Sequence, residues 1–204
     1  MSARTCHTSG TDALQEGVVY GPAVLLVVAA TEVELRFVSG ADTLCCGVGP
    51  VEAAHATARR LAREAPGALL HVGIAGARGL EPPALVLGSE AVYCDLVDAA
   101  RDFPRVERAR PDASLLECAS QALPQAAVLP IATSARVGGG ARCATVEAME
   151  GFGVLRAAEA AGVPALELRA VSNTFDSARA DWKIDEALAA LSDALARLIE
   201  ALDA

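Results

Sequence analysis

The sequence predicts an α/β fold, a single-domain three-layer α/β/α arrangement around a central, mainly parallel or mixed sheet. Short apolar runs rich in β-branched residues alternate with helical patterns along the chain. The length of 204 residues, with 53% hydrophobic residues, is enough for one substantial core. We therefore expect one domain over residues 23–204. A poorly ordered leader is expected over 1–22, where Ser, Thr, Gly and Pro are mixed without a period.

Six apolar runs predict strands, most of them buried on both faces. They cover residues 24–29, 43–48, 68–72, 85–94, 127–135 and 165–171. Gly88 interrupts the fourth run and predicts a bulge. The third run is followed by Gly-Ile-Ala-Gly at 73–76, which we interpret as a tight glycine turn at the end of that strand.

Helical patterns separate these strands, and two polar segments predict loops. The helices are expected over residues 51–63, 114–123, 146–161 and from 185 to the C-terminus. Pro50 stands where a helix favours its first residue. Leucines from Leu188 to Leu202 recur at spacings of three and four, so one face of the last helix should pack on the sheet. Segments 100–113 and 174–184 are the expected loops.

The charge and the cysteine pattern restrict the partners of the chain. A net charge of −9 argues against a nucleic-acid or anionic-membrane surface. The longest apolar run, 23–30, is too short to span a bilayer, which needs roughly 20 residues. The six cysteines show neither a CxxC pair nor a zinc spacing, so we expect reduced thiols, no metal and a cytoplasmic protein.

Polar residues at the ends of apolar runs are the candidate functional groups. Thr-Glu-Val-Glu at 31–34 follows the first strand, Met149-Glu150-Gly151 opens a helical pattern, and Ser172-Asn173 ends the last strand. Because the carboxyl ends of parallel strands meet at one crevice, a carboxylate and an amide there can face the same ligand. Each motif also has a structural explanation, since acids stabilise helix starts and Ser-Asn can cap a turn.

The glycine turns and the histidines carry weaker signals. Gly-Val-Gly at 47–49 and the glycines of 73–76 could bring backbone N–H groups to an anion. Neither forms a GxGxxG or Walker motif, and tight strand-to-helix turns explain both. His7, His55 and His71 are scattered, which gives no Ser-His-Asp or Cys-His arrangement, and we expect His71 to be a buried core histidine.

Taken in order, these motifs resemble those of the nucleoside phosphorylase and nucleosidase superfamily, and most closely its futalosine hydrolase family. The resemblance runs from about Val24 to the C-terminus. It rests on the segments 29–34, 47–49, 73–76, 147–152 and 169–173. It implies a nucleoside phosphorylase-like fold, a homo-oligomer, a small-molecule nucleoside substrate, hydrolysis of an N-glycosidic bond, and neither a cofactor nor a metal.

The resemblance also assigns expected roles to residues of this chain. Glu34 matches the acidic residue that positions or deprotonates the attacking water, with Glu32 as the alternative. Glu150 matches the carboxylate that grips the ribose hydroxyls, with Met149 packing against the sugar. A carboxylate beside a cationic ribose stabilises the transition state electrostatically. Further substrate contacts are expected from Gly76, Phe152, Ser172 and Arg179.

Asn173 is the departure that predicts the base. Superfamily members that release adenine carry an aspartic acid here, which protonates N7 of the leaving base. An amide cannot act as a general acid, but it donates and accepts hydrogen bonds, which suits the N1–H and O6 of a 6-oxopurine. The resemblance thus implies release of hypoxanthine from futalosine, in menaquinone biosynthesis. The alternative is another purine nucleoside such as inosine, methylthioadenosine or S-adenosylhomocysteine.

The nucleophile and the far end of the substrate complete the prediction. Phosphorylases of the superfamily place a phosphate-binding arginine where His71 stands and a serine where Ile74 stands, so water is the expected nucleophile. The benzoate carboxylate of futalosine could pair with Arg179 or Arg136. A non-catalytic nucleoside-binding protein is a third hypothesis, which the presence of Glu34, Glu150 and Asn173 argues against.

Overall fold

The computed structural model describes residues 24–96, 104–140 and 142–203, so the predicted leader lies outside the described residues. In these ranges eight strands form one mixed sheet. They are β1 (Leu25–Ala29), β2 (Asp42–Cys45), β3 (Ala68–Ala77), β4 (Leu85–Tyr93), β5 (Arg108–Ala109), β6 (Ala127–Thr133), β7 (Val146–Ala148) and β8 (Ala165–Thr174).

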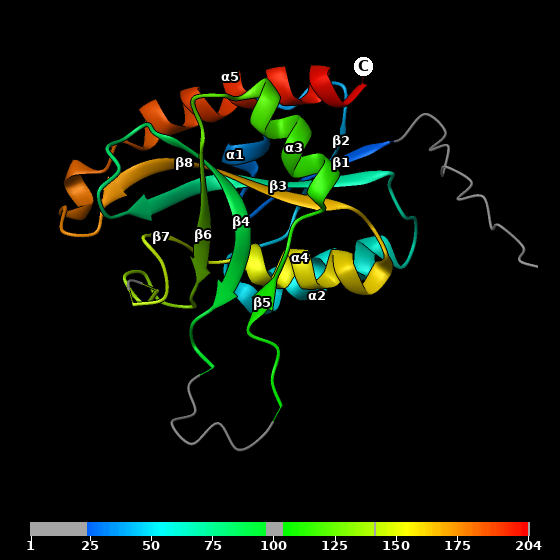
Figure 1. Cartoon of the computed structure of the whole chain (residues 1–204), viewed down its shortest axis with the longest axis horizontal. Coiled ribbons are helices and arrows are strands. Elements are labelled where there is room, and N and C mark those ends of the chain that lie inside the picture. Colours follow the sequence, from blue (N-terminus) through cyan, green and yellow to red (C-terminus); the bar gives the residue numbers. More distant parts are fainter. Residues whose placement is uncertain (1–23, 97–103, 141, 204) are drawn as a thin grey trace, which may run out of the picture.

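Helices cover both faces of the sheet (Figure 1). They are α1 (Glu32–Leu35), α2 (Pro50–Leu61), α3 (Ala113–Ala122), α4 (Gly151–Ala161) and α5 (Ile184–Asp203), with a short 3-10 helix η1 (Arg179–Asp181). Helices α2 and α4 lie side by side below the sheet, whereas α3 and α5 lie above it. The predicted three-layer α/β/α fold is therefore confirmed. None of the described helices is long and apolar enough to cross a membrane.

The strand order explains where a ligand can bind. The sheet runs β2-β1-β3-β7-β6-β4-β5, and β8 pairs with both β3 and β4. Strands β3, β8, β4, β6 and β7 thus close into a ring of pairings. Strands β1, β3 and β8 are mutually parallel. Their carboxyl ends meet at one edge, which is where open α/β sheets place ligands.

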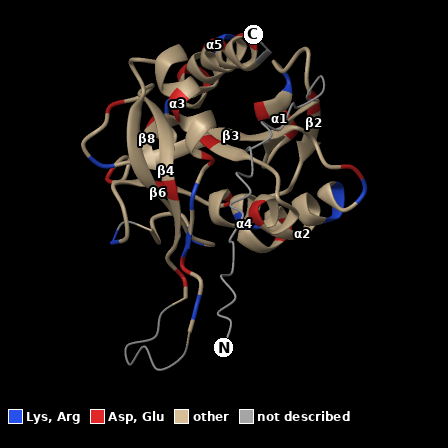
Figure 2. Cartoon of the chain, turned by 45° about the vertical axis from the view of Figure 1, so that its right-hand side comes forward, with Lys and Arg blue, Asp and Glu red and all other residues tan. Residues whose placement is uncertain are grey.

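The core divides along the pleat of β1. Leu25, Val27 and Ala29 face the cluster beneath α3 and α5, while Leu26 and Val28 face the cluster beneath α2 and α4. The leucine stripe of α5 packs as predicted on the sheet. On the opposite face of the sheet, basic residues gather in the last turn of α2 (Figure 2), at the negative end of the helix dipole.

The predicted glycine turn at 73–76 is wrong. Strand β3 continues through these residues to Ala77, because β8 pairs with it from Leu69 to Ala77, with a register shift between Ala75 and Gly76. Sequence periodicity does not show such a partner. The bulge predicted at Gly88 is confirmed by a register shift between β4 and β6 at Gly88 and Glu90.

The predicted helix over 146–161 begins later than expected. Its first part, Val146–Ala148, is the strand β7, which is fully buried between β3 and β6. The helix α4 starts only at Gly151. The loop predicted over 100–113 contains the two-residue strand β5 and the first residue of α3, while residues 97–103 lie outside the described part.

The prediction of reduced cysteines throughout is also wrong. Cys94, just after β4, and Cys143, just before β7, form a disulfide with their Cα atoms 6.2 Å apart, a usual separation. The two residues are 49 positions apart, so only the fold brings them together. Among the described residues, Cys45, Cys46 and Cys118 are free thiols.

Candidate active site

A pocket of about 370 Å³ opens at the carboxyl edge of β1, β3 and β8. This volume lies within the range of small-molecule sites. Seven of the nine predicted site residues line it, and they are Glu34, Gly76, Met149, Glu150, Ser172, Asn173 and Arg179. The structure therefore brings together segments that are up to 145 positions apart, from Glu34 to Arg179.

Glu32 and Phe152 are the two predicted site residues that do not line the pocket. Glu32 is exposed, because residues two apart on the helical turn of α1 face different directions. The ring of Phe152 stacks on Tyr93 with the centroids 5.1 Å apart. The backbone N–H of Phe152 donates to Oγ1 of Thr133 at 2.9 Å.

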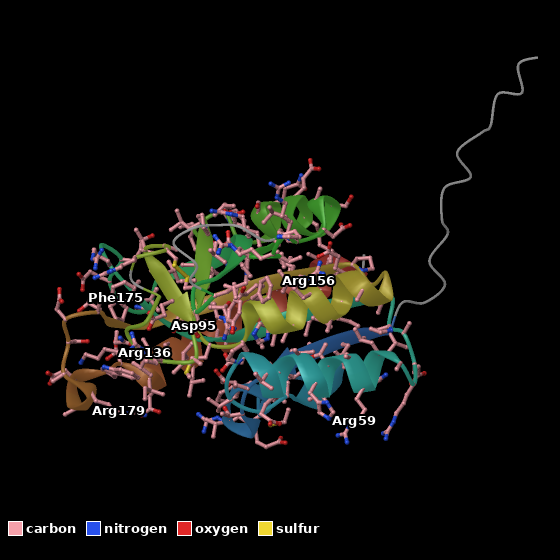
Figure 3. All side chains as sticks on the ribbon, turned by 90° about the horizontal axis from the view of Figure 1, so that it is seen from below. Arg59, Asp95, Arg136, Arg156, Phe175 and Arg179 are labelled. Atoms are coloured by element: carbon pink, nitrogen blue, oxygen red, sulfur yellow. A yellow bond between two sulfur atoms is a disulfide. The ribbon has the colours of Figure 1, made fainter. Side chains whose placement is uncertain are left out.

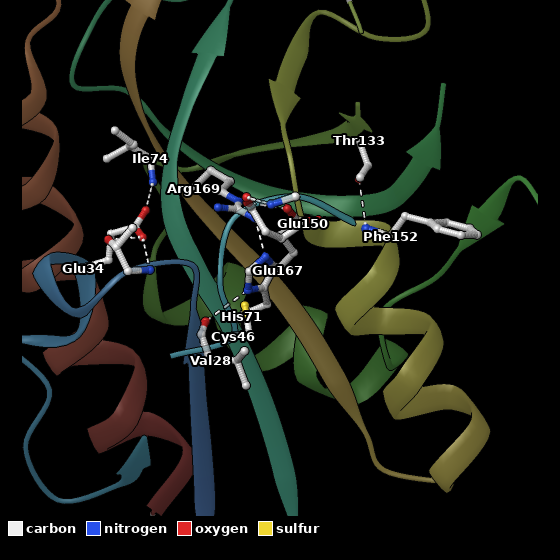
Figure 4. A network of polar contacts seen from close by, with 12 residues as sticks. Val28, Glu34, Cys46, His71, Ile74, Thr133, Glu150, Phe152, Glu167 and Arg169 are labelled. Carbon is white, nitrogen blue, oxygen red and sulfur yellow. Dashed lines mark hydrogen bonds and ion pairs between the residues drawn. The ribbon is translucent and has the colours of Figure 1, made fainter. Parts of the chain in front are cut away.

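Glu34 is held in the pocket by three hydrogen bonds. The backbone N–H and the hydroxyl of Thr31 donate to its Oε2 at 3.1 and 2.8 Å, which reflects the Thr-x-x-Glu spacing of a capping box. The N–H of Ile74 on β3 donates to its Oε1 at 3.1 Å (Figure 4). The carboxylate is buried and spans from the end of β1 to β3 in a fixed orientation.

Glu150 lies where two helices begin. It is the N-cap of α4, and its Oε1 accepts a hydrogen bond at 3.0 Å from the N–H of Gly49, the N-cap of α2. Its Oε2 lies 3.7 Å from Nη2 of Arg169. Gly47 and Gly49 have positive φ angles and form the predicted strand-to-helix turn. The anion that this turn holds is thus a side chain of the protein itself.

Arg169, in the middle of β8, carries a buried charge that the sequence prediction missed. Its Nε–H donates to Glu167 at 2.8 Å, and its Nη2–H donates to Nε2 of His71 (Figure 4). Burial opposes the charge of Arg169, but Glu167, Glu150 and Glu34 outweigh it and raise the pKa of Arg169. The sequence did contain a signal for this pair. Glu167 and Arg169 lie inside an apolar strand, where charged residues must be paired.

His71 is the predicted core histidine, and its environment keeps it neutral. It is fully buried, and its Nδ1 lies 3.0 Å from the carbonyl oxygen of Val28. Because a carbonyl only accepts, Nδ1 carries the proton and Nε2 accepts from Arg169. Burial and the Arg169 charge lower the pKa of His71 well below its ordinary value. Burial likewise raises the pKa of Glu167, and Arg169 opposes that rise.

Glycines on β3 make room for these side chains. A Cβ on Gly73 would lie 2.3 Å from Nη1 of Arg169 and 2.7 Å from Oε1 of Glu34. A Cβ on Gly76 would lie 3.0 Å from Nδ2 of Asn173. The glycines that suggested a turn therefore serve close approach of side chains within a strand.

The amide of Asn173 is oriented by its neighbours on β8. The hydroxyl of Ser172 lies within hydrogen-bond distance of both Asn173 Oδ1, at 2.9 Å, and the carbonyl oxygen of Ala75, at 3.2 Å. The Nδ2 group donates to the Thr174 carbonyl at 3.2 Å. An amide has two N–H donors and two lone pairs. One donor and one acceptor of Asn173 are thus left for a ligand.

Glu147 is a second carboxylate that the sequence prediction missed. It is buried, lines the pocket, and accepts hydrogen bonds from the N–H groups of Gly138 and Gly140. Val137, between Ser134 and these glycines, also lines the pocket. Glu147 therefore anchors a rim loop, defined here as residues 134–140. Among the described residues, no cluster of three or more His, Cys, Asp or Glu side chains could hold a metal ion.

The mouth of the pocket combines a cation with apolar side chains. The guanidinium of Arg179 lies 5.0 Å from the ring centre of Trp182, and both residues line the pocket. Ile184 and Leu188 add apolar surface. Arg136 lies at the same end of the molecule as Arg179 (Figure 3). It is exposed and is not one of the lining residues.

Comparison with known proteins agrees with this fold. A sequence model described as the Phosphorylase superfamily matches residues 43–139. A mutant futalosine hydrolase of Helicobacter pylori superposes with a TM-score of 0.77 at 17% identity, covering 86% of this chain and 98% of that one. The MTA/SAH nucleosidase of Streptococcus pneumoniae, solved with 8-aminoadenine, gives a TM-score of 0.75 at 19% identity, covering 87% and 99%. The fold is thus shared with these nucleosidase structures.

Sequence similarity narrows the class further. The chain is 37% identical to futalosine hydrolase of Streptomyces coelicolor over an alignment of 194 positions. The match covers 82% of this chain and 82% of that protein. It belongs to the futalosine hydrolase family.

Proposed function

We propose that the protein hydrolyses the N-glycosidic bond of futalosine and releases hypoxanthine, a step of menaquinone biosynthesis. The observation that carries this proposal is the meeting of Glu34, Glu150 and Asn173 around one pocket. The family relationship to the Streptomyces coelicolor enzyme supports the same substrate.

The sugar is proposed to bind against Glu150. Its carboxylate is fixed by Gly49, so it meets the ribose hydroxyls without having to reorganise. As the glycosidic bond breaks, positive charge develops on the ribose. Fixed negative charge beside it lowers the barrier, because the interaction strengthens in the transition state. Met149, next to Glu150 in the pocket lining, would pack against the sugar.

Water is the proposed nucleophile, with Glu34 as its base. Oε1 of Glu34 and Nη1 of Arg169 both approach Gly73, and both residues line the pocket. A water there could be oriented by the guanidinium while the carboxylate takes its proton. Phosphate is disfavoured at this place, because Ile74 offers no side-chain donor and the neutral His71 already accepts from Arg169.

The base and the benzoate are proposed to occupy opposite parts of the pocket. The free donor and the free acceptor of Asn173 match O6 and N1–H of hypoxanthine. Arg179 would pair with the benzoate carboxylate, and the ring would lie against Trp182. An arginine stacked on an aromatic ring presents its donors in a fixed plane suited to a carboxylate.

We also propose that the protein acts as a homo-oligomer. Val33 and Val48 line the pocket and are 49% and 57% accessible, and Phe37, four residues after Val33, is 44% accessible. Such a cluster favours burial against another surface. Light scattering coupled to gel filtration tests this directly, and a strictly monomeric mass at micromolar concentration would contradict it.

The function is tested by chromatography of the bases released from three nucleosides. The protein is incubated with futalosine, inosine or methylthioadenosine, each with and without phosphate. The proposal expects hypoxanthine from futalosine at a rate that phosphate does not change. Faster release from inosine or methylthioadenosine would favour another nucleosidase, a strict need for phosphate would favour a phosphorylase, and binding without release would favour a binding protein.

A further inference from the structure

Arg169 donates hydrogen bonds to two buried acceptors, Glu167 and His71. Glu167, two residues earlier on β8, binds its Nε–H at 2.8 Å, and His71 accepts from its Nη2. Both partners are fully buried, and neither lines the pocket. Arg169 does line the pocket. Glu167 and His71 thus contact Arg169 from outside the pocket, whereas Arg169 itself lines it.

The 2.8 Å contact with Arg169 favours an ionised carboxylate at Glu167, although burial raises the pKa of this group. A Cβ on Gly151 would lie within 2.3 to 2.6 Å of the three carboxyl atoms of Glu167, so the group lies against the first residue of α4. The N-terminus of a helix carries partial positive charge. An arginine does not lose its proton in proteins, so the 2.8 Å contact is charge-assisted.

Glu34, Glu150 and Arg169 line one part of the pocket, which we call the pocket floor. The net charge of the pocket floor depends on Glu167. Arg169 and Glu167 neutralise each other, and His71 adds no charge because it is neutral. The carboxylates of Glu34 and Glu150 remain as net negative charge toward the ribose. If Glu167 were neutral, the Arg169 cation, 3.7 Å from Glu150, would offset one of them.

We propose that Glu167 is a positioning residue that holds the Arg169 guanidinium and cancels its charge, so that the pocket floor stays negative for a cationic ribosyl group. This inference rests on the proposed function for its effect on turnover. Its effect on binding a cationic sugar holds whichever nucleoside is the substrate.

The test compares Glu167→Gln with the wild-type protein in binding two sugars by calorimetry. One is an imino-ribitol with a protonated ring nitrogen, and the other is the neutral anhydro-ribitol of the same shape. Glutamine still accepts the Nε–H of Arg169, so geometry is kept and one charge is lost. We expect the preference for the cation to fall roughly 10- to 100-fold, the order of magnitude that Coulomb's law gives for one unit charge inside a protein.

The neutral sugar and a surface variant provide the controls. Binding of the anhydro-ribitol should stay unchanged, and Glu159→Gln, which removes the same charge from an exposed pair with Arg156, should change neither affinity. With futalosine, Glu167→Gln should lower kcat by a similar factor and leave KM nearly constant. An unchanged cation preference, or an equal loss for both sugars, overturns the proposal.

A second variant covers the case in which Glu167→Gln does not fold. Gly151→Ala pushes a methyl group against the Glu167 carboxylate without changing any charge. It should weaken the contact with Arg169 and lower the cation preference in the same direction. The wild-type protein could prefer the cationic sugar, and Glu167→Gln could abolish that preference, while futalosine is not cleaved. In that case only the substrate assignment fails.

Discussion

Glu150 and Gly49 are joined by a hydrogen bond of 3.0 Å across 101 positions of sequence. The contact ties the N-terminus of α4 to the N-terminus of α2. The two helices pack closely there, because a Cβ on Gly153 would lie 2.5 Å from the carbonyl oxygen of Pro50. The orientation of the proposed ribose carboxylate thus depends on helix packing as well as on its own motif.

Glu150→Gln should lower kcat for futalosine by roughly 10²- to 10³-fold, the usual effect of removing one transition-state electrostatic contact. The amide keeps the shape and can still accept from Gly49, so the melting temperature should change little. Steady-state kinetics and thermal unfolding measure both. Glu117→Gln, an exposed change on α3, is the matched control. Near-normal turnover of the Glu150 variant would remove this residue from the mechanism.

Asn173→Asp should shift the base preference from hypoxanthine toward adenine. A carboxylic acid can protonate N7 of adenine, which an amide cannot do, and a general acid contributes roughly 10²- to 10⁴-fold. At neutral pH the carboxylate also loses the N–H that we assign to O6. The ratio of kcat/KM for methylthioadenosine over futalosine, measured at several pH values, checks this. A ratio unchanged from wild type would contradict the assignment of Asn173.

Buried His71 should make stability depend on pH. Its pKa is lowered in the folded state, so below its ordinary value of 6.5 the unfolded chain binds a proton that the folded chain does not. The free energy of unfolding should then fall as pH falls below 6.5, by about 1.4 kcal/mol per pH unit. Urea unfolding of His71→Gln should lack this contribution, whereas exposed His55→Gln should retain it. Equal slopes in the two variants would refute the neutral, buried state of His71.

Glu147→Gln should raise KM for futalosine more than it lowers kcat. The carboxylate anchors the rim loop through the N–H groups of Gly138 and Gly140, and charged hydrogen bonds of this kind contribute about 1.5–3 kcal/mol each. Weakening them frees Val137, which lines the pocket. An increase in KM of roughly tenfold is expected. A fall in kcat at constant KM would instead indicate a direct role in the chemistry.

Thiol reactivity should separate two adjacent cysteines. Cys45 is exposed, whereas Cys46 is buried, and burial together with Glu150 raises the pKa of its thiol to about 12. Alkylation at pH 8 without a reductant, followed by peptide mapping, should label Cys45 and leave Cys46 unlabelled. The same map should recover Cys94 and Cys143 as one linked pair. Labelling of Cys46 at the rate of Cys45 would contradict its buried position.

The sequence predicted the layers, most strands and the motifs that meet in the pocket, because these are local patterns. Glu34, Glu150 and Asn173 stand at strand or helix ends, where side chains face the crevice. The turn at 73–76 was predicted wrongly because glycine can serve either a turn or close approach. The pairing of β8 with β3, together with the position of Arg169 against Gly73, decides between the two.

The charged groups behind the pocket were missed for a related reason. Glu167 and Arg169 alternate with apolar residues in β8. The apolar pattern predicts the strand, but it does not say what the two charged side chains contact. Their pairing with each other is visible at a spacing of two, but the partner His71 lies 98 positions away from Arg169. Strand β7 was read as helix because its pairing with β3 and β6 leaves no periodic signal in three residues.

The most direct test of hydrolysis at this pocket is the mass of the sugar product formed from futalosine in phosphate buffer. We expect hypoxanthine and a sugar with a hydroxyl at the former glycosidic carbon, in equal amounts and at the same rate as without phosphate. A phosphate ester at that carbon, or no cleavage of futalosine at all, would contradict it.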